Sequence, residues 1–162
     1  MIRTITATLL GLCLLAGPAS ASTTTKGKLY TSMTGADTAA LLERHGHTVT
    51  QKVSQSGAPI HTFELNGVRT SLYHFNCGED GECSSIQLYV GLGMENKPSV
   101  QLINTWNQSY RLTRAYIDDV GDPCLEADLS LKGGTSKQAI IEMLEMFEYS
   151  TQKYMEHVGF SR

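Results

Sequence analysis

The sequence predicts an α+β domain built on an antiparallel sheet, in the order helix, four strands, helix, two strands, helix. Asn66-Gly67 lies between two alternating segments and is the strongest short-range signal of a β-hairpin. Cys77 and Cys83 enclose a second short loop, rich in Gly, Asp and Glu. Apolar side chains at helical spacing before, between and after the strands complete the prediction.

The first predicted helix follows Thr34. This threonine can cap the helix, and Asp37 lies in the first turn, where a carboxylate favours the positive end of the helix dipole. Gly46 ends the helix. A strand-like segment over residues 48–54 comes next and ends at a turn over residues 55–59.

The two hairpins predict the register of the next three strands. A two-residue turn at 66–67 places Glu64 opposite Arg69, which is a favourable cross-strand pair. Pairing the two cysteines places Leu72 opposite Leu88. Both turns then put one set of side chains on a common buried face: His61, Phe63, Leu65, Val68, Thr70, Leu72, Ile86, Leu88, Val90 and Leu92.

The second half of the chain continues the pattern. Pro98 suits a helix start and opens a helix that includes Trp106. Two strands follow, over residues 111–117 and 124–131, joined by a turn. A helix over residues 136–158, with apolar side chains along one side, closes the chain.

The first 21 residues are typical of a cleavable secretory signal peptide. Arg3 supplies a positive charge, an uncharged and largely apolar stretch follows, and small residues precede a cut after Ala21. Gly17-Pro18 interrupts the apolar run before it reaches the roughly 20 residues that a membrane helix needs. We therefore expect the protein in the periplasm or secreted.

Processing is expected to leave a flexible lead-in over residues 22–31 and a single domain over residues 32–162. The formal net charge of the whole chain is −3, and Lys and Arg do not cluster. This balance argues against binding to nucleic acid or to an anionic membrane. No second apolar run is long enough for the mature chain to insert into a bilayer.

Three cysteines remain after processing. In an oxidising compartment, Cys77 and Cys83 across a short loop predict a disulfide, and a metal site there needs two further ligands. Cys124 is then a free thiol, an intermolecular partner, or the true partner of one of the other two. A bridge from Cys77 to Cys124 contradicts the register given above.

Several short strings match a known family in order and spacing. They are Ala39 to Leu42 with His45-Gly46, Asn66-Gly67-Val68, Cys77, Cys83 with Ile86 to Tyr89, Leu102 to Asn107, Arg111, Arg114-Ala115-Tyr116, Leu125 to Asp128, and Gly133-Gly134. On these residues the chain resembles the YbjN family of small bacterial proteins, which are often labelled sensory transduction regulators.

The resemblance implies a fold similar to type III secretion chaperones, in which helices pack on one face of an antiparallel sheet and the protein commonly dimerises. It implies a regulatory or binding role and no catalytic residues. A type III chaperone works on the cytoplasmic side, so an exported member departs from that role.

Four residues invite a functional interpretation as a binding patch: Asn104, Trp106, Asn107 and Arg111. The structural interpretation is stronger. Trp106 can bury a large surface on the sheet, and Asn107 and Arg111 can satisfy backbone groups where the helix meets the strand.

Two further groups of residues are candidate reactive centres. His61 and His74 share the apolar face, so their rings can approach, but a third metal ligand is not evident at that end of the sheet. Cys124 shares a strand face with Glu126 and Asp128, whose charges raise a thiol pKa and weaken it as a nucleophile. Established catalytic motifs are missing from the sequence.

The resulting prediction is an exported, non-catalytic regulatory or protein-binding module of a bacterial cell envelope, without cofactor or metal. Its partner is expected to be a protein or peptide, and a homodimer is a further expectation. The alternative is a small thiol- or metal-dependent enzyme that uses Cys124, or His61 with His74.

Overall fold

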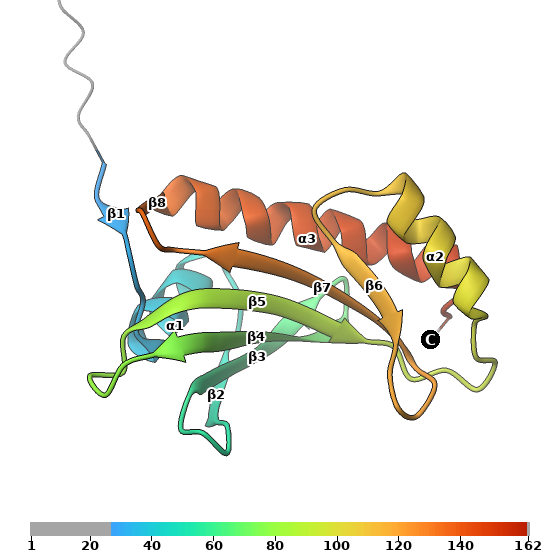
Figure 1. Ribbon diagram of the computed structural model, residues 1–162, viewed down its shortest axis with the longest axis horizontal. Helices are drawn as coiled ribbons and strands as arrows, with labels where there is room; N and C mark the ends of the chain where they lie inside the picture. Colours follow the sequence, from blue (N-terminus) through green and yellow to red (C-terminus); the bar gives the residue numbers. More distant parts are fainter. Residues whose placement is uncertain (1–26, 162) are drawn as a thin grey trace, which may run out of the picture.

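The computed structural model describes residues 27–161 (Figure 1). The expected signal peptide and its cleavage site after Ala21 lie outside the described residues. The described helices are α1 (Gly35–Arg44), α2 (Val100–Ser109) and α3 (Lys137–Val158). The strands are β1 (Leu29–Tyr30), β2 (Thr50–Val53), β3 (Pro59–Leu65), β4 (Val68–Cys77), β5 (Cys83–Gly91), β6 (Arg114–Ile117), β7 (Pro123–Ser130) and β8 (Thr135–Ser136).

The main sheet has the strand order β2-β3-β4-β5-β7-β6, and every neighbouring pair in it is antiparallel. This confirms the predicted α+β class and the order of its elements. The short strands β1 and β8 pair separately and were not predicted; β1 falls in the segment expected to be a lead-in. Their pairing ties the chain before α1 to the start of α3.

The predicted register of the two hairpins is confirmed. Glu64 lies opposite Arg69, Leu72 opposite Leu88, and the two cysteines opposite each other. The common face of these strands is buried, and its fully buried side chains include Leu65, Ile86, Leu88 and His61. Turn chemistry and strand alternation are thus sufficient to orient the central strands.

The helix termini follow local capping rules. Thr34 and Asp37 form a reciprocal capping box at α1, and the Ser136 hydroxyl accepts a hydrogen bond from the Ala139 N–H at the start of α3. At α2 the cap is Ser99, whose hydroxyl accepts from the Leu102 N–H. Pro98 therefore precedes the cap and does not occupy the first helical position predicted for it.

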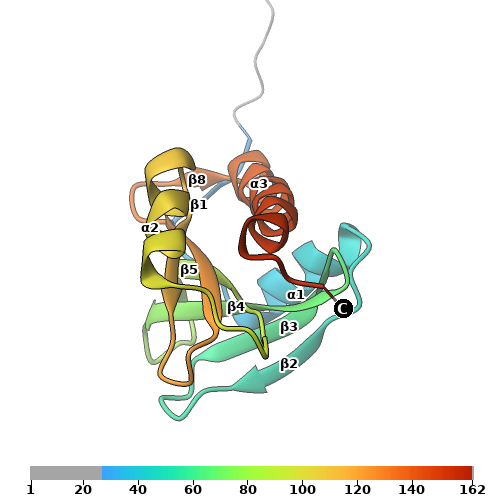
Figure 2. The same ribbon diagram turned by 90° about the vertical axis from the view of Figure 1, so that its right-hand side faces the viewer.

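The sheet curves around α1 and α3, which lie on its inner side (Figure 2). α1 contacts β3, α3 contacts β5 and β7, and α2 packs against β6 and α3. The largest fully buried side chains are Trp106, Tyr154 and Phe147, at the junction of α2, α3 and the sheet. The outer side of the sheet carries the side chains of the alternate positions, among them Tyr73 and Tyr89, whose rings meet edge to face, and Gln87, which is bonded to Asp128.

Strand β6 is shorter than the predicted strand over residues 111–117. Leu112 has a φ of 67°, a left-handed conformation that a strand cannot contain, so pairing begins only at Arg114. β6 consequently pairs with β7 only from Pro123 to Glu126 (Figure 1). Within the described part of the chain, no strand lies beside Ala127–Ser130 on that edge.

Candidate functional site

Trp106 of the predicted patch is a core residue. It is fully buried, its ring stacks on Tyr110 with ring centroids 3.8 Å apart, and its indole N–H donates to the Thr113 hydroxyl at 3.1 Å. The side chain thus holds the turn after α2 against the helix. Trp106 therefore has no exposed surface that could contact a ligand.

Asn107 closes the edge of β6. Its side-chain amide donates to the Ala115 carbonyl and its side-chain oxygen accepts from the Ala115 N–H, each at 2.9 Å. This is the backbone-satisfying role considered for Asn107 from the sequence. Asn104 and Arg111 are exposed, so a binding role for these two stays a prediction.

The two histidines of the alternative hypothesis do lie together, with ring centroids 5.2 Å apart. His74 is bonded on both ring nitrogens, to the Thr38 hydroxyl at 2.8 Å and the Pro59 carbonyl at 3.0 Å. His61 is fully buried; the Gly35 backbone lies near its ring, but neither ring nitrogen makes a well-formed hydrogen bond within residues 27–161. Among residues 27–161, no group of three His, Cys, Asp or Glu side chains is arranged to hold a metal ion.

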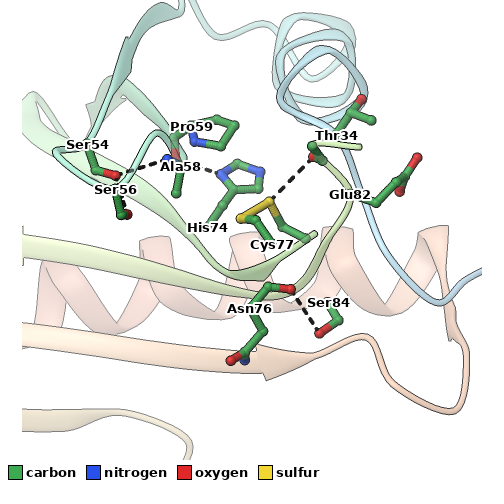
Figure 3. The surroundings of a disulfide bond; sticks show 12 residues. Thr34, Ser54, Ser56, Ala58, Pro59, His74, Asn76, Cys77, Glu82 and Ser84 are labelled. Atoms are coloured by element: carbon green, nitrogen blue, oxygen red, sulfur yellow. Dashed lines mark hydrogen bonds between the residues drawn. A yellow bond between two sulfur atoms is a disulfide. The ribbon is translucent and has the colours of Figure 1, made fainter. Parts of the chain in front are cut away.

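A disulfide joins Cys77 and Cys83 at the end of the β4–β5 hairpin (Figure 3). The loop between them is held by hydrogen bonds from the Gly78 N–H to the Glu82 carbonyl and from the Gly81 N–H to the Gly78 carbonyl. Figure 3 shows His74 close by, and His74 and Cys77 line one shallow pocket.

Removing this disulfide is expected to destabilise the domain moderately. The double substitution Cys77→Ser with Cys83→Ser should lower the free energy of unfolding by about 2 kcal/mol, because the bridge closes a short loop in the unfolded chain. Urea titrations of oxidised and reduced protein measure the difference. A Cys124→Ser variant is the control, since its stability should remain sensitive to reductant; equal stability of oxidised and reduced wild type would contradict the prediction.

Cys124 is a fully buried thiol on the outer side of the sheet. Its sulfur lies 3.2 Å from the Tyr89 hydroxyl and 3.8 Å from an Asp118 carboxylate oxygen. Burial raises the pKa of the Cys124 thiol, and the charges of Asp118 and Glu126 raise it further. The predicted rise and the contribution of Glu126 are confirmed, but burial is the larger cause of the raised pKa, and Asp118 acts in place of the predicted Asp128. A protonated, enclosed thiol is a poor nucleophile.

Glu126, beside this thiol, is also buried, and both of its carboxylate oxygens accept hydrogen bonds. Its carboxylate accepts hydrogen bonds from the Arg114 guanidinium and, at 2.8 Å, from the Tyr116 hydroxyl. Burial is the main cause that raises the pKa of Tyr116, and the hydrogen bond to Glu126 raises it further. The cluster therefore consists of mutually satisfied groups that pin β6 to β7, not of groups poised for acid–base chemistry.

A groove of about 360 Å³ lies between the first half of α3 and the second half of β7. Its lining is mostly apolar and consists of Leu112, Ala127, Asp128, Leu129, Ala139, Glu142, Met143 and Met146. Leu112, at the turn after α2, is 70% exposed and borders one end. Two methionines in a wall give a surface that adapts to differently shaped apolar side chains.

Sequence reasoning missed this groove. Met143 and Met146 appear in the sequence only as members of an amphipathic helix, and Leu112 appears as part of a strand. The feature that creates the groove is the late start of β6, which depends on the left-handed backbone at Leu112. A Leu between Arg111 and Thr113 carries no local signal for that conformation.

The model of one protein family matches residues 39–160, more than half of the chain. The chain belongs to the YbjN family. The family is described as "Putative bacterial sensory transduction regulator". No curated protein and no solved structure matches the chain.

Membership of the YbjN family supports a regulatory or protein-binding role and is consistent with a protein that is not an enzyme. The match spans α1 from Ala39 through α3, so every wall of the groove belongs to the YbjN domain. None of the helices in residues 27–161 is long and apolar enough to cross a membrane.

Proposed function

We propose that this YbjN protein is an exported, non-catalytic module that binds a protein partner in the bacterial cell envelope through the groove between α3 and β7. The observation that carries the proposal is the groove itself. It combines apolar walls with an exposed leucine, Leu112, at one end. Partner-binding sites typically combine adaptable apolar contacts with a polar rim.

Two features support export. The first 21 residues have the charge and apolar pattern of a cleavable signal peptide. The disulfide between Cys77 and Cys83 suits an oxidising compartment such as the periplasm. Mass spectrometry of the protein from its native bacterium should find Ser22 as the first residue; an intact N-terminus in a cytoplasmic fraction would refute export.

The binding role is tested by a matched pair of charge substitutions. Leu112 and Val120 are both loop residues with 70% and 72% exposure, but only Leu112 borders the groove. Affinity-tagged Leu112→Lys and Val120→Lys proteins are compared with wild type for co-purifying envelope proteins. We expect Leu112→Lys to lose the partner and Val120→Lys to keep it. Equal recovery of the partner by all three proteins would contradict binding at the groove.

A further inference from the structure

We infer that the partner supplies an extended peptide segment that adds as a strand to the free edge of β7, beside Asp128 and Ser130. This inference rests on the proposed function and specifies how the groove is occupied. Strand addition of this kind uses backbone hydrogen bonds for affinity and side-chain pockets for selectivity.

The direction of the β7 backbone follows from two hydrogen-bond patterns. Asn107 bonds both backbone groups of Ala115, so Ala115 faces away from β7 and its strand neighbours face toward it. On β7, the even-numbered residues such as Glu126 therefore face the β6 edge. The Leu131 N–H donates to the Ser84 carbonyl at 2.9 Å, which places the odd-numbered residues on the β5 side.

Asp128 and Ser130 thus present backbone groups to the edge that β6 leaves uncovered. No strand in residues 27–161 pairs with Asp128 on that side. At Ser130 the carbonyl accepts from the Thr135 hydroxyl at 3.3 Å, and the N–H has no strand partner on this side among residues 27–161. Exposed edge groups of this kind are a template for another strand.

The groove lies directly beside this edge. Ala127 and Leu129 point toward the helices, and Met143 and Met146 form the opposite wall. A strand placed next to β7 directs alternate side chains into this space and the others away from it. The segment that fits therefore has apolar residues at alternate positions.

Two carboxylates near the groove, those of Glu142 and Asp128, further restrict which peptide segment fits. Glu142 is exposed on α3 and lines the groove, and no ion pair within residues 27–161 neutralises it. The Asp128 carboxylate accepts from the Gln87 amide on the outer side of the sheet. It attracts Arg114 electrostatically but forms no close ion pair within residues 27–161. A lysine or arginine in the added segment complements Asp128 where it faces the outer side of the sheet, and complements Glu142 where it faces the groove.

The opposite edge of the sheet, formed by β2, does not combine an unpaired strand edge with an apolar groove. β2 is exposed along its whole length, but the pocket near it is lined mainly by polar residues of the α1–β2 loop, β2, β3 and β4. It therefore provides an internal control for an exposed edge without an apolar groove. The Ser54 N–H donates to the Ala58 carbonyl, so the N–H of the preceding Val53 points away from β3.

A synthetic seven-residue peptide, in which valine alternates with threonine and lysine, tests the inference on the full mature chain. Hydrogen exchange monitored by NMR should show that the amides of Asp128 and Ser130 exchange rapidly in the free protein and slow by about tenfold or more with peptide. The same peptide, N-methylated at the positions that donate to β7, should bind at least about tenfold more weakly. Absence of binding at millimolar peptide, or binding without protection of these two amides, would overturn strand addition.

Substitutions provide an independent check. Asp128→Pro removes the edge N–H, whereas Asp128→Ala keeps it and loses only the carboxylate. We expect Asp128→Pro to weaken peptide binding at least about fivefold relative to Asp128→Ala, and Val53→Pro to leave it unchanged. Equal binding by Asp128→Pro and Asp128→Ala would overturn the inference. Loss of envelope partner by Leu112→Lys alongside that result would leave groove binding intact, so the two proposals fail separately.

Discussion

Replacing Trp106 with alanine is expected to lower the free energy of unfolding by about 3–5 kcal/mol, the range for a buried aromatic residue cut back to a methyl group. Trp106 is fully buried and makes an edge contact with Tyr154, with ring centroids 5.0 Å apart, in addition to its stacking on Tyr110. Its loss also leaves the Thr113 hydroxyl without its donor. The substitution therefore creates a cavity where α2, α3 and the turn before β6 meet.

Circular dichroism during urea unfolding is the suitable measurement, because Trp106 is the only tryptophan and its fluorescence disappears with it. Val100→Ala on the same helix is the matched control, since Val100 is 74% exposed and should change stability by no more than about 0.5 kcal/mol. A loss below about 1 kcal/mol for Trp106→Ala would contradict the core role assigned to this residue.

Acid is expected to destabilise the domain through its buried histidines. Burial lowers the pKa of His74 to about 4, and burial also lowers the pKa of His61. The unfolded chain binds protons at both rings below about pH 6.5, while the folded chain keeps His74 neutral until about pH 4. The free energy of unfolding is therefore highest above pH 6.5 and falls as the pH decreases to about 4. His74 alone accounts for a loss of up to about 3 kcal/mol over this interval.

Among residues 27–161, the groups in contact with the His74 ring are neutral, so they do not stabilise its protonated form. His74 contacts the Thr38 hydroxyl of α1 and the Pro59 carbonyl of β3, and the neighbouring ring is His61. Asp37 on α1 is engaged by Thr34, and hydrogen bonds from Thr34 hold its pKa below the usual value. Its effect on stability thus appears at lower pH than that of the histidines.

The measurement is the free energy of unfolding by urea at intervals from pH 7 to pH 4. His74→Gln should flatten the pH dependence in this interval, whereas His45→Gln, at an exposed position, should leave the slope unchanged. An identical slope in wild type and His74→Gln would show that His74 does not account for the acid sensitivity.

The central strands were predictable because their information is local. Asn66-Gly67 specifies a tight turn, and once the turn is placed, alternation decides which side chains are buried. The same holds for the capping box of Thr34 and Asp37, whose spacing can be seen in the sequence. Each of these features depends on residues within a few positions of one another.

The groove was not predictable because it depends on contacts between distant segments. It requires the turn before β6, the second half of β7 and the first half of α3 to meet, and the left-handed backbone at Leu112 shortens β6 enough to leave space. The buried, unbonded ring of His61 is a similar case. Its place on the apolar face was predicted, but the lack of a hydrogen-bond partner is a property of the assembled core.

Site-specific photo-crosslinking in living bacteria tests protein binding at the groove most directly. A benzophenone amino acid replaces Leu112 in one strain and Val120 in another, two positions of nearly equal exposure, one before β6 and one after it in the chain. Binding at the groove predicts a discrete protein adduct from position 112 that is missing from position 120. Adducts of equal yield from both positions, or none from position 112, would contradict the groove between α3 and β7 as the binding site.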